Sequence, residues 1–86
     1  MQENLDIILK IKNGDSSLFN DLLENHKKMI YKIINIYKLE VGDFYIDSND
    51  LFQEASIALY KAIFSFEEDK NVMFSTYAYL AIRNRL

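Results

Sequence analysis

Chain-breaking residues are nearly absent from this sequence of 86 residues, which contains no proline and only two glycines. Sandwich and hairpin-rich folds need such residues at frequent turns. Half of the residues are hydrophobic, which is enough for the core of one small domain. The sequence therefore predicts an all-α fold, a small bundle of about four helices in which residues 1–86 form a single domain.

Composition argues against several classes of protein. The chain has no cysteine, which excludes a disulfide scaffold and cysteine-rich zinc sites and suits a reducing compartment. The N-terminal stretch MQENLD is polar and acidic, unlike a signal peptide. The longest apolar runs are too short to span a bilayer. We therefore expect a cytoplasmic protein without a membrane partner.

Apolar residues recur at steps of three and four in several segments, the spacing of a helix with one buried face. The predicted helices are residues 3–12, 16–37, 48–66 and 75–86. Residues 38–47 predict a loop around Gly42, from which the stretch 44–46 could fold back onto the core. The last predicted helix reaches Leu86 without a stop signal, so the chain is expected to be a fragment of a longer protein.

Local signals mark the ends of these helices. Asn13 and Gly14 tolerate the left-handed conformation that often ends a helix, so they are expected to end the first. Short polar residues that can accept a hydrogen bond from backbone N–H groups are expected to cap the other three. These predicted caps are Asp15 or Ser16, Asp47 or Ser48, and Ser75 or Thr76.

Catalytic signals are weak. The single histidine, His26, lies on an apolar stripe and is expected to be a partly buried, hydrogen-bonded helix residue. No second histidine or cysteine is present to complete a metal pair or a nucleophile–base pair. The acidic cluster Glu67, Glu68 and Asp69 lacks the spacing of a calcium loop. We expect no enzyme activity, no metal and no cofactor.

Two features favour binding surfaces. In the third predicted helix, the polar face combines Ile57 and Tyr60 with Asp50, Gln53 and Glu54, which is unusual for a face that only meets water. The C-terminal segment carries aromatic, hydroxyl and basic residues without an acid, a set that suits unpaired nucleic acid, because each stacked base contributes about 1–3 kcal/mol. The net charge of −3 argues against nucleic acid, but from residue 70 onward all charges are positive, and lysines 27, 28, 32 and 38 form a second basic cluster. On spacing alone, Tyr77 could equally be a core aromatic.

The stretch DLFQEASIALYKAIFSFEEDKNVMFSTYAYLAIRNRL, residues 50–86, resembles region 2 of bacterial sigma factors of the sigma-70 family. The matching cues are D-L-x-Q-E, then L-x-K-A, then F-S-T-Y-A and finally I-R. The upstream stretch NGDSSLFNDLLENHKKMIYKII resembles the preceding part of the same domain. The similarity thus covers nearly the whole chain, and the blocks at their mutual spacing are more specific than any one of them.

The resemblance implies a non-catalytic sigma factor domain for transcription initiation, with two partners. In the family, the D-L-x-Q-E helix docks on the clamp helices of the RNA polymerase β′ subunit, and the F-S-T-Y segment captures the non-template strand of the promoter −10 element, holding an extruded adenine. The implied polymerase-binding residues are Asp50, Gln53, Glu54, Ser56, Ile57 and Tyr60. The implied DNA-binding residues are Phe66, Glu67, Lys70, Phe74, Ser75, Thr76, Tyr77, Leu80, Ala81, Arg83 and Asn84. An anti-sigma factor would be a further partner.

The chain departs from the family pattern at Leu80 and Ala81, where housekeeping members carry a tryptophan pair. Because these side chains are smaller than tryptophan, the resemblance implies weaker melting of promoter DNA and a stricter dependence on promoter sequence, as in alternative sigma factors. We expect this fragment to lack the −35-binding domain of the family. Two other interpretations stay open: an all-α interaction module that mimics a sigma domain without binding DNA, and, less well supported because the turn at 67–72 is charged and lacks glycine, a duplex-binding helix-turn-helix.

Overall fold

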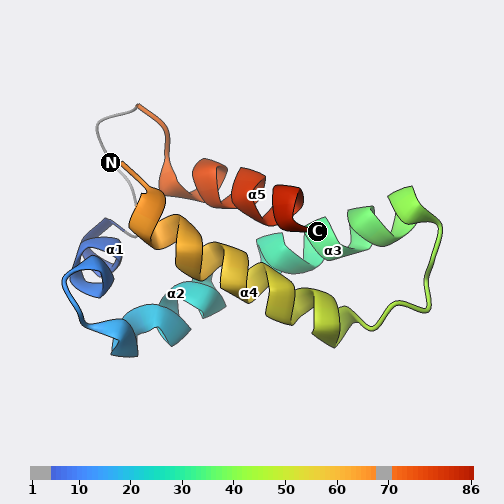
Figure 1. Cartoon of the computed structure of the whole chain (residues 1–86), viewed down its shortest axis with the longest axis horizontal. Helices are drawn as coiled ribbons and strands as arrows, with labels where there is room; N and C mark the ends of the chain where they lie inside the picture. The colour runs from blue at the N-terminus through green and yellow to red at the C-terminus, as the bar shows by residue number, and fades with distance from the viewer. Residues whose placement is uncertain (1–4, 68–70) are drawn as a thin grey trace.

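The computed structural model describes residues 5–67 and 71–86, and within them all regular secondary structure is helical (Figure 1). The elements are α1 (Leu5–Lys12), the short 3₁₀ helix η1 (Ser16–Leu18), α2 (Phe19–Asn25), α3 (Lys27–Val41), α4 (Ser48–Ser65) and α5 (Phe74–Arg85). The all-α prediction is confirmed. Among the residues described, no helix combines the length and the apolar character needed to cross a bilayer.

Helix α4 is the centre of the bundle. It packs against α1, α2, α3 and α5, and its most extensive contact is with α5, which runs beside it (Figure 1). The buried face of α4 includes Ala55, Ala58 and Ala62, whose short side chains allow neighbouring helices to approach closely. The apolar stripe predicted for this helix is therefore the one that is buried.

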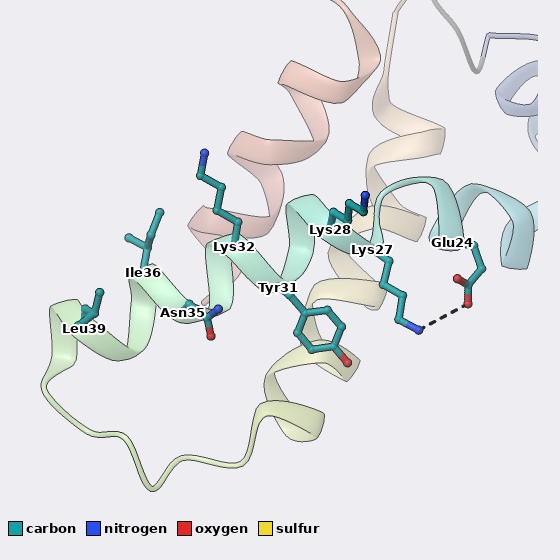
Figure 2. Close-up of a pocket in the computed structure, with 8 residues that line it drawn as sticks. All are labelled: Glu24, Lys27, Lys28, Tyr31, Lys32, Asn35, Ile36 and Leu39. Carbon is teal, nitrogen blue, oxygen red and sulfur yellow. Dashed lines mark ion pairs between the residues drawn. The ribbon is translucent and has the colours of Figure 1, made fainter.

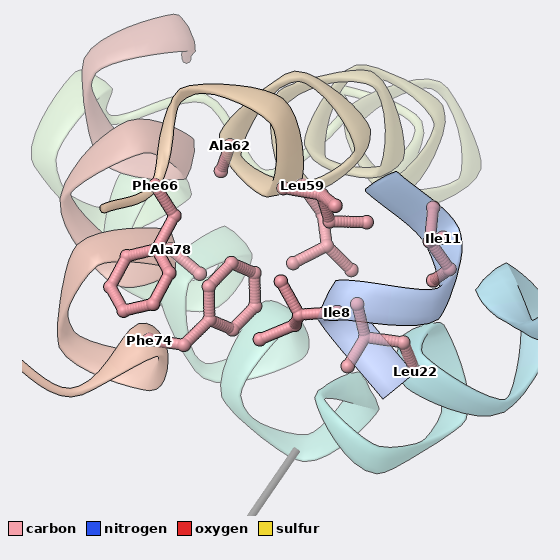
Figure 3. Packing of buried hydrophobic residues seen from close by; sticks show 9 residues of the cluster. Ile8, Ile11, Leu22, Leu59, Ala62, Phe66, Phe74 and Ala78 are labelled. Atoms are coloured by element: carbon pink, nitrogen blue, oxygen red, sulfur yellow. The ribbon is translucent and has the colours of Figure 1, made fainter. Parts of the chain in front are cut away.

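The core consists of two clusters. One joins α1, α2, the C-terminal half of α4 and the start of α5, and includes Ile8, Leu59, Phe66 and Phe74 (Figure 3). The other joins α3 to the N-terminal half of α4 and to Ile82 of α5. Burial of apolar surface in these clusters contributes about 25 cal/mol per Å² to the free energy of folding. It is the main stabilisation available to so small a domain.

The predicted single helix 16–37 is wrong, because the chain leaves helical geometry at His26, with φ −106° and ψ 5°. In a continuous helix the His26 N–H would bond to the Leu22 carbonyl. Instead, that N–H bonds to the Leu23 carbonyl at 3.1 Å, and the His26 ring Nδ1 donates to the Leu22 carbonyl at 2.9 Å. The side chain thus replaces the lost backbone bond, so that α2 and α3 can take different directions. The expected hydrogen bonding of His26 is confirmed, but the residue lies between two helices and is fully buried, with an exposed fraction of 5%.

The predicted loop 38–47 is too long, because α3 continues to Val41. Gly42 then ends the helix in the left-handed conformation, with φ 70°. Of the residues expected to fold back, only Ile46 packs against the core, whereas Phe44 and Tyr45 point into solvent with exposed fractions of 64% and 98%. An Asx turn, in which the Tyr45 N–H donates to the Asp43 carboxylate, directs this loop outward.

Two of the predicted helix signals are confirmed and two are wrong. Helix α1 ends before Asn13–Gly14, with Gly14 at φ 109°, and the Asp47 carboxylate caps α4 by accepting the Asn49 N–H at 2.8 Å. Asp15 precedes η1 but makes no side-chain cap, because its carboxylate accepts the Ser17 hydroxyl instead. Helix α5 begins at Phe74 after an uncapped Met73, so neither Ser75 nor Thr76 caps it.

Candidate functional site

A hollow of about 390 Å³ opens beside Tyr77, where the end of α4 meets α5. It is lined by Ser65, Phe66, Glu67, Val72 and Tyr77, and we call it the Tyr77 hollow. The Tyr77 side chain is half-buried, and its hydroxyl donates to the Ser65 hydroxyl at 2.8 Å. Its ring lies 5.6 Å from the Phe66 ring, centroid to centroid. Tyr77 is therefore a wall of an open hollow and not a residue enclosed in the core.

Phe66, which lines the Tyr77 hollow, packs against further aromatic rings in the core. Phe66 and Phe74 are each only 2% exposed and meet edge to face at 5.3 Å, and Phe74 in turn meets the His26 ring at 5.7 Å. Lys12 fixes the same corner from α1, because its Nζ donates to the Phe66 carbonyl at 2.6 Å. The sequence placed both phenylalanines among the DNA contacts, but Phe74 is a core residue, and Phe66 reaches the hollow only as part of its lining.

The start of α5 lines a second hollow of about 490 Å³, against α3. It brings together the predicted residues Ser75, Thr76 and Leu80 with Met29 and Tyr79. Leu80 is 53% exposed, so an apolar side chain projects where a ligand could cover it. Ala81 lies apart from this group, in a shallow depression with Lys61, Ser65 and Arg85.

The basic residues at the end of α5 are engaged with carboxylates of neighbouring helices. Arg83 pairs with Glu40 of α3 at 3.3 Å, and Arg85 pairs with Glu54 of α4 at 2.7 Å. The pKa of Arg83 is raised above its usual value, first by a hydrogen bond with Tyr79 and then by the Glu40 charge, so this arginine stays cationic. Asn84 is exposed, and Lys70 lies outside the described residues.

The predicted polymerase-binding residues gather on the exposed side of α4. Asp50, Gln53, Glu54, Ile57 and Tyr60 are all exposed. Ser56, by contrast, is half-buried, and its hydroxyl donates to the Phe52 carbonyl at 2.9 Å, so it stands at the edge of this surface. We call the five exposed residues, together with Phe64, the α4 face.

Some residues of these surfaces were missed by sequence reasoning. Phe64 is 47% exposed and stands 5.1 Å from the Tyr60 ring, and its spacing of seven from Ile57 could have placed it on the α4 face. Ser65 and Val72 of the Tyr77 hollow, and Met29 of the second hollow, carried no local signal. They join the site through the packing of separate elements.

The part of the chain that the structure describes contains no group of histidines and acids that could hold a metal ion. Glu67 of the predicted acidic cluster lies in the Tyr77 hollow, whereas Glu68 and Asp69 are outside the described residues.

The structure is thus a small all-α domain with a hollow beside the half-buried Tyr77 and an exposed helix face of acidic and apolar residues. The family model described as Sigma-70 region 2 matches residues 22–86. The chain belongs to this family.

Curated relatives agree with this assignment. The chain is 34% identical, over 99% of its length, to the RNA polymerase sigma factor SigA of Clostridium acetobutylicum, and 32% identical, over 98%, to the RNA polymerase sigma-H factor of Bacillus subtilis. It is 32% identical to the RNA polymerase sigma factor SigI8 of Acetivibrio thermocellus over 95% of its length. The chain spans only 21%, 37% and 32% of these relatives. No solved structure gives a significant match.

Proposed function

We propose that this chain acts in transcription initiation as region 2 of a sigma factor, with one surface for core RNA polymerase and another for the promoter −10 element. The proposal rests on the family and on the separation of the two candidate surfaces. The α4 face and the Tyr77 hollow share no residue, so the two proposed partners do not compete for the same side chains.

The Tyr77 hollow is the observation that carries the DNA-binding part of the proposal. A base extruded from the −10 element enters the hollow and stacks against the accessible side of the Tyr77 ring. Extrusion costs a few kcal/mol, and stacking on an aromatic ring returns about 1–3 kcal/mol per base. Hydrogen bonds from groups that line the hollow, Ser65 and Glu67, supply further discrimination among bases.

The second hollow extends the DNA surface along the start of α5. Ser75 and Thr76 offer hydroxyl groups, and Leu80 offers an exposed apolar side chain. Leu80 and Ala81 stand where the family's housekeeping members have a tryptophan pair, and both are smaller. We infer that this domain melts promoters weakly and depends more strictly on the sequence that it reads.

The α4 face is the proposed site for the clamp helices of the β′ subunit. Ile57, Tyr60 and Phe64 supply apolar area for a neighbouring helix, and Asp50 and Glu54 supply negative charge for basic residues on it. Aromatic side chains surrounded by polar groups are typical of protein interfaces.

The test of base capture compares two strands and four proteins, namely the original chain and three variants. The ligand is a fluorescent single-stranded −10 non-template oligonucleotide, and the control ligand has an abasic site in place of the adenine expected to flip. Tyr77→Ala should weaken binding of the intact strand about tenfold, because it removes the stacking surface. Tyr77→Phe keeps the ring and loses only the bond to Ser65, so it should bind within about twofold of the original chain. Fluorescence anisotropy measures both.

Tyr60→Ala is the matched control, because this ring is 41% exposed on the α4 face and should not affect oligonucleotide binding. Circular dichroism establishes that each variant is folded at the temperature of the assay. Equal affinity of the original chain for the intact and abasic strands would contradict base capture. Oligonucleotide binding unchanged by Tyr77→Ala would contradict the assignment to this hollow.

A further inference from the structure

A groove of about 740 Å³ runs along the outer side of α3 (Figure 2). Its lining includes Lys28, Tyr31, Lys32, Asn35, Ile36 and Leu39. None of these residues lines the Tyr77 hollow or the second hollow, and none belongs to the α4 face. This surface, which we call the α3 groove, is therefore not used by the proposed function.

The α3 groove is basic in a chain whose net charge is −3. Lys27, at its end, is bound to Glu24 at 3.9 Å. Lys28 and Lys32 are exposed and form no ion pair with the described residues. Two neighbouring ammonium groups that have no ion-pair partner among the described residues attract an anionic partner.

The same groove has an apolar part. Leu39 is 65% exposed, Ile36 is half-buried, and the Tyr31 ring is half-buried against Phe52, with 5.1 Å between ring centroids. Exposed aliphatic side chains at this position gain nothing from a phosphate backbone. Stacking on Phe52 holds the Tyr31 ring in place beside these aliphatic side chains.

The spacing of these groups matches a helix lying alongside. Lys28, Lys32, Asn35 and Leu39 recur at steps of four, three and four, so they form one ridge along α3. The twelve residues 28–39 extend over roughly 16 Å of helix, which is about three turns of a partner helix. Such a helix would place carboxylates near the two lysines and apolar residues against Ile36 and Leu39.

We propose that the α3 groove binds an acidic amphipathic helix of a partner protein. The ridge combines positive charge with apolar area, and an acidic amphipathic helix would contact both. Nucleic acid would contact only the lysines. The inference is independent of the proposed function, because its residues are separate from both of the surfaces proposed above.

The probe is a synthetic helical peptide of about four turns, with leucines on one face and glutamates on both flanks. Fluorescence anisotropy of the labelled peptide should show saturable binding to the whole chain, and a peptide with lysines in place of the glutamates should not bind. The double variant K28E/K32E should weaken binding of the acidic peptide about tenfold, since two attractions become repulsions. Leu39→Ser should weaken it about threefold through the lost apolar contact.

Lys10→Glu is the matched control, because Lys10 is an equally exposed lysine on α1, and it should leave the affinity unchanged. Each variant is compared with the original chain by thermal unfolding. The proposal is overturned if the acidic peptide does not bind, or binds K28E/K32E as well as the original chain. It is also overturned if the K28E/K32E variant binds oligo(dT) more weakly but the acidic peptide equally well, because the groove would then belong to nucleic acid. Self-association of the chain through this groove, measured by sedimentation, would assign the groove to a second copy and would also overturn it.

Discussion

At the scale of single residues, Glu54 is a group with two potential partners. Its carboxylate lies on the α4 face, yet it accepts from Arg85 of α5 at 2.7 Å. The pair is solvent-exposed, with side-chain exposures of 33% for Arg85 and 50% for Glu54. Exposed ion pairs contribute little to stability, so a basic residue of a partner can share or replace Arg85 at low cost.

We predict that Glu54→Arg weakens capture of a purified β′ clamp-helix fragment roughly tenfold, because an attraction across the interface becomes a repulsion. Biolayer interferometry at moderate salt measures the change. The charge-swapped double variant E54R/R85E restores the pair within the domain and should remain as weak as the single variant. Full recovery in the double variant would show that Glu54 acts only by positioning α5, and the polymerase contact would then be wrong at this residue.

Single residues also mark the limit of what the sequence could predict about the site. Spacing placed Asp50, Glu54 and Ile57 on an exposed face, because a helix with a clear buried stripe leaves only one other side. Phe74 looked identical to Tyr77 in sequence terms, as an aromatic beside hydroxyl residues. In the folded domain, Phe74 is enclosed because its ring packs against both Phe66 and His26, whereas Tyr77 remains partly exposed. The sequence does not show this difference in packing.

At the scale of elements, the prediction succeeded where a helix has strong local signals at its ends. Helix α4 has a capping aspartate and a continuous apolar stripe, and its predicted range differs from the observed one by a single residue. The break at His26 had no such signal, since the apolar stripe passes through it without interruption. A side-chain bond to the Leu22 carbonyl, which periodicity does not encode, stabilises that break.

Because α4 contacts α1, α2, α3 and α5, a defect at its first turn should affect the stability of the whole domain. We predict that Asp47→Ala lowers the free energy of unfolding by about 1 kcal/mol, through loss of the bond to the Asn49 N–H. Urea denaturation followed by circular dichroism measures it. Asp47→Asn keeps an oxygen acceptor and should cost much less, so equal losses for the two variants would rule out capping as the cause.

At the scale of the whole molecule, the chain presents three separate surfaces on one small bundle. The α4 face is acidic and apolar, and the α3 groove is basic. The described lining of the two hollows contains no lysine or arginine, and the two arginines at the end of α5 are already paired. The net charge of −3 therefore hides a polarised distribution. Among the described residues, few unpaired cations lie near these hollows, so we expect base contacts to carry much of the affinity for a DNA strand.

This distribution predicts a shallow salt dependence for oligonucleotide binding. Each phosphate contacted on a single strand contributes a slope of about −0.7 in log K against log salt, so two or three contacts give a slope of roughly −1.4 to −2. Anisotropy titrations across a range of sodium chloride concentrations measure this slope. A slope near zero with weak, base-independent binding would favour the interaction module without DNA contacts, and a much steeper slope would mean that the basic α3 groove joins the DNA surface.

Packing of the Tyr77 ring against Phe66, together with the hydroxyl bond to Ser65, orients the tyrosine ring before any ligand arrives. Immobilising a flexible side chain during association costs about 0.5–1.5 kcal/mol in lost rotational freedom. In this domain that ordering takes place during folding, together with the rest of the core. We therefore expect the proposed base site to be preorganised, with the Tyr77 ring already in place before a base enters.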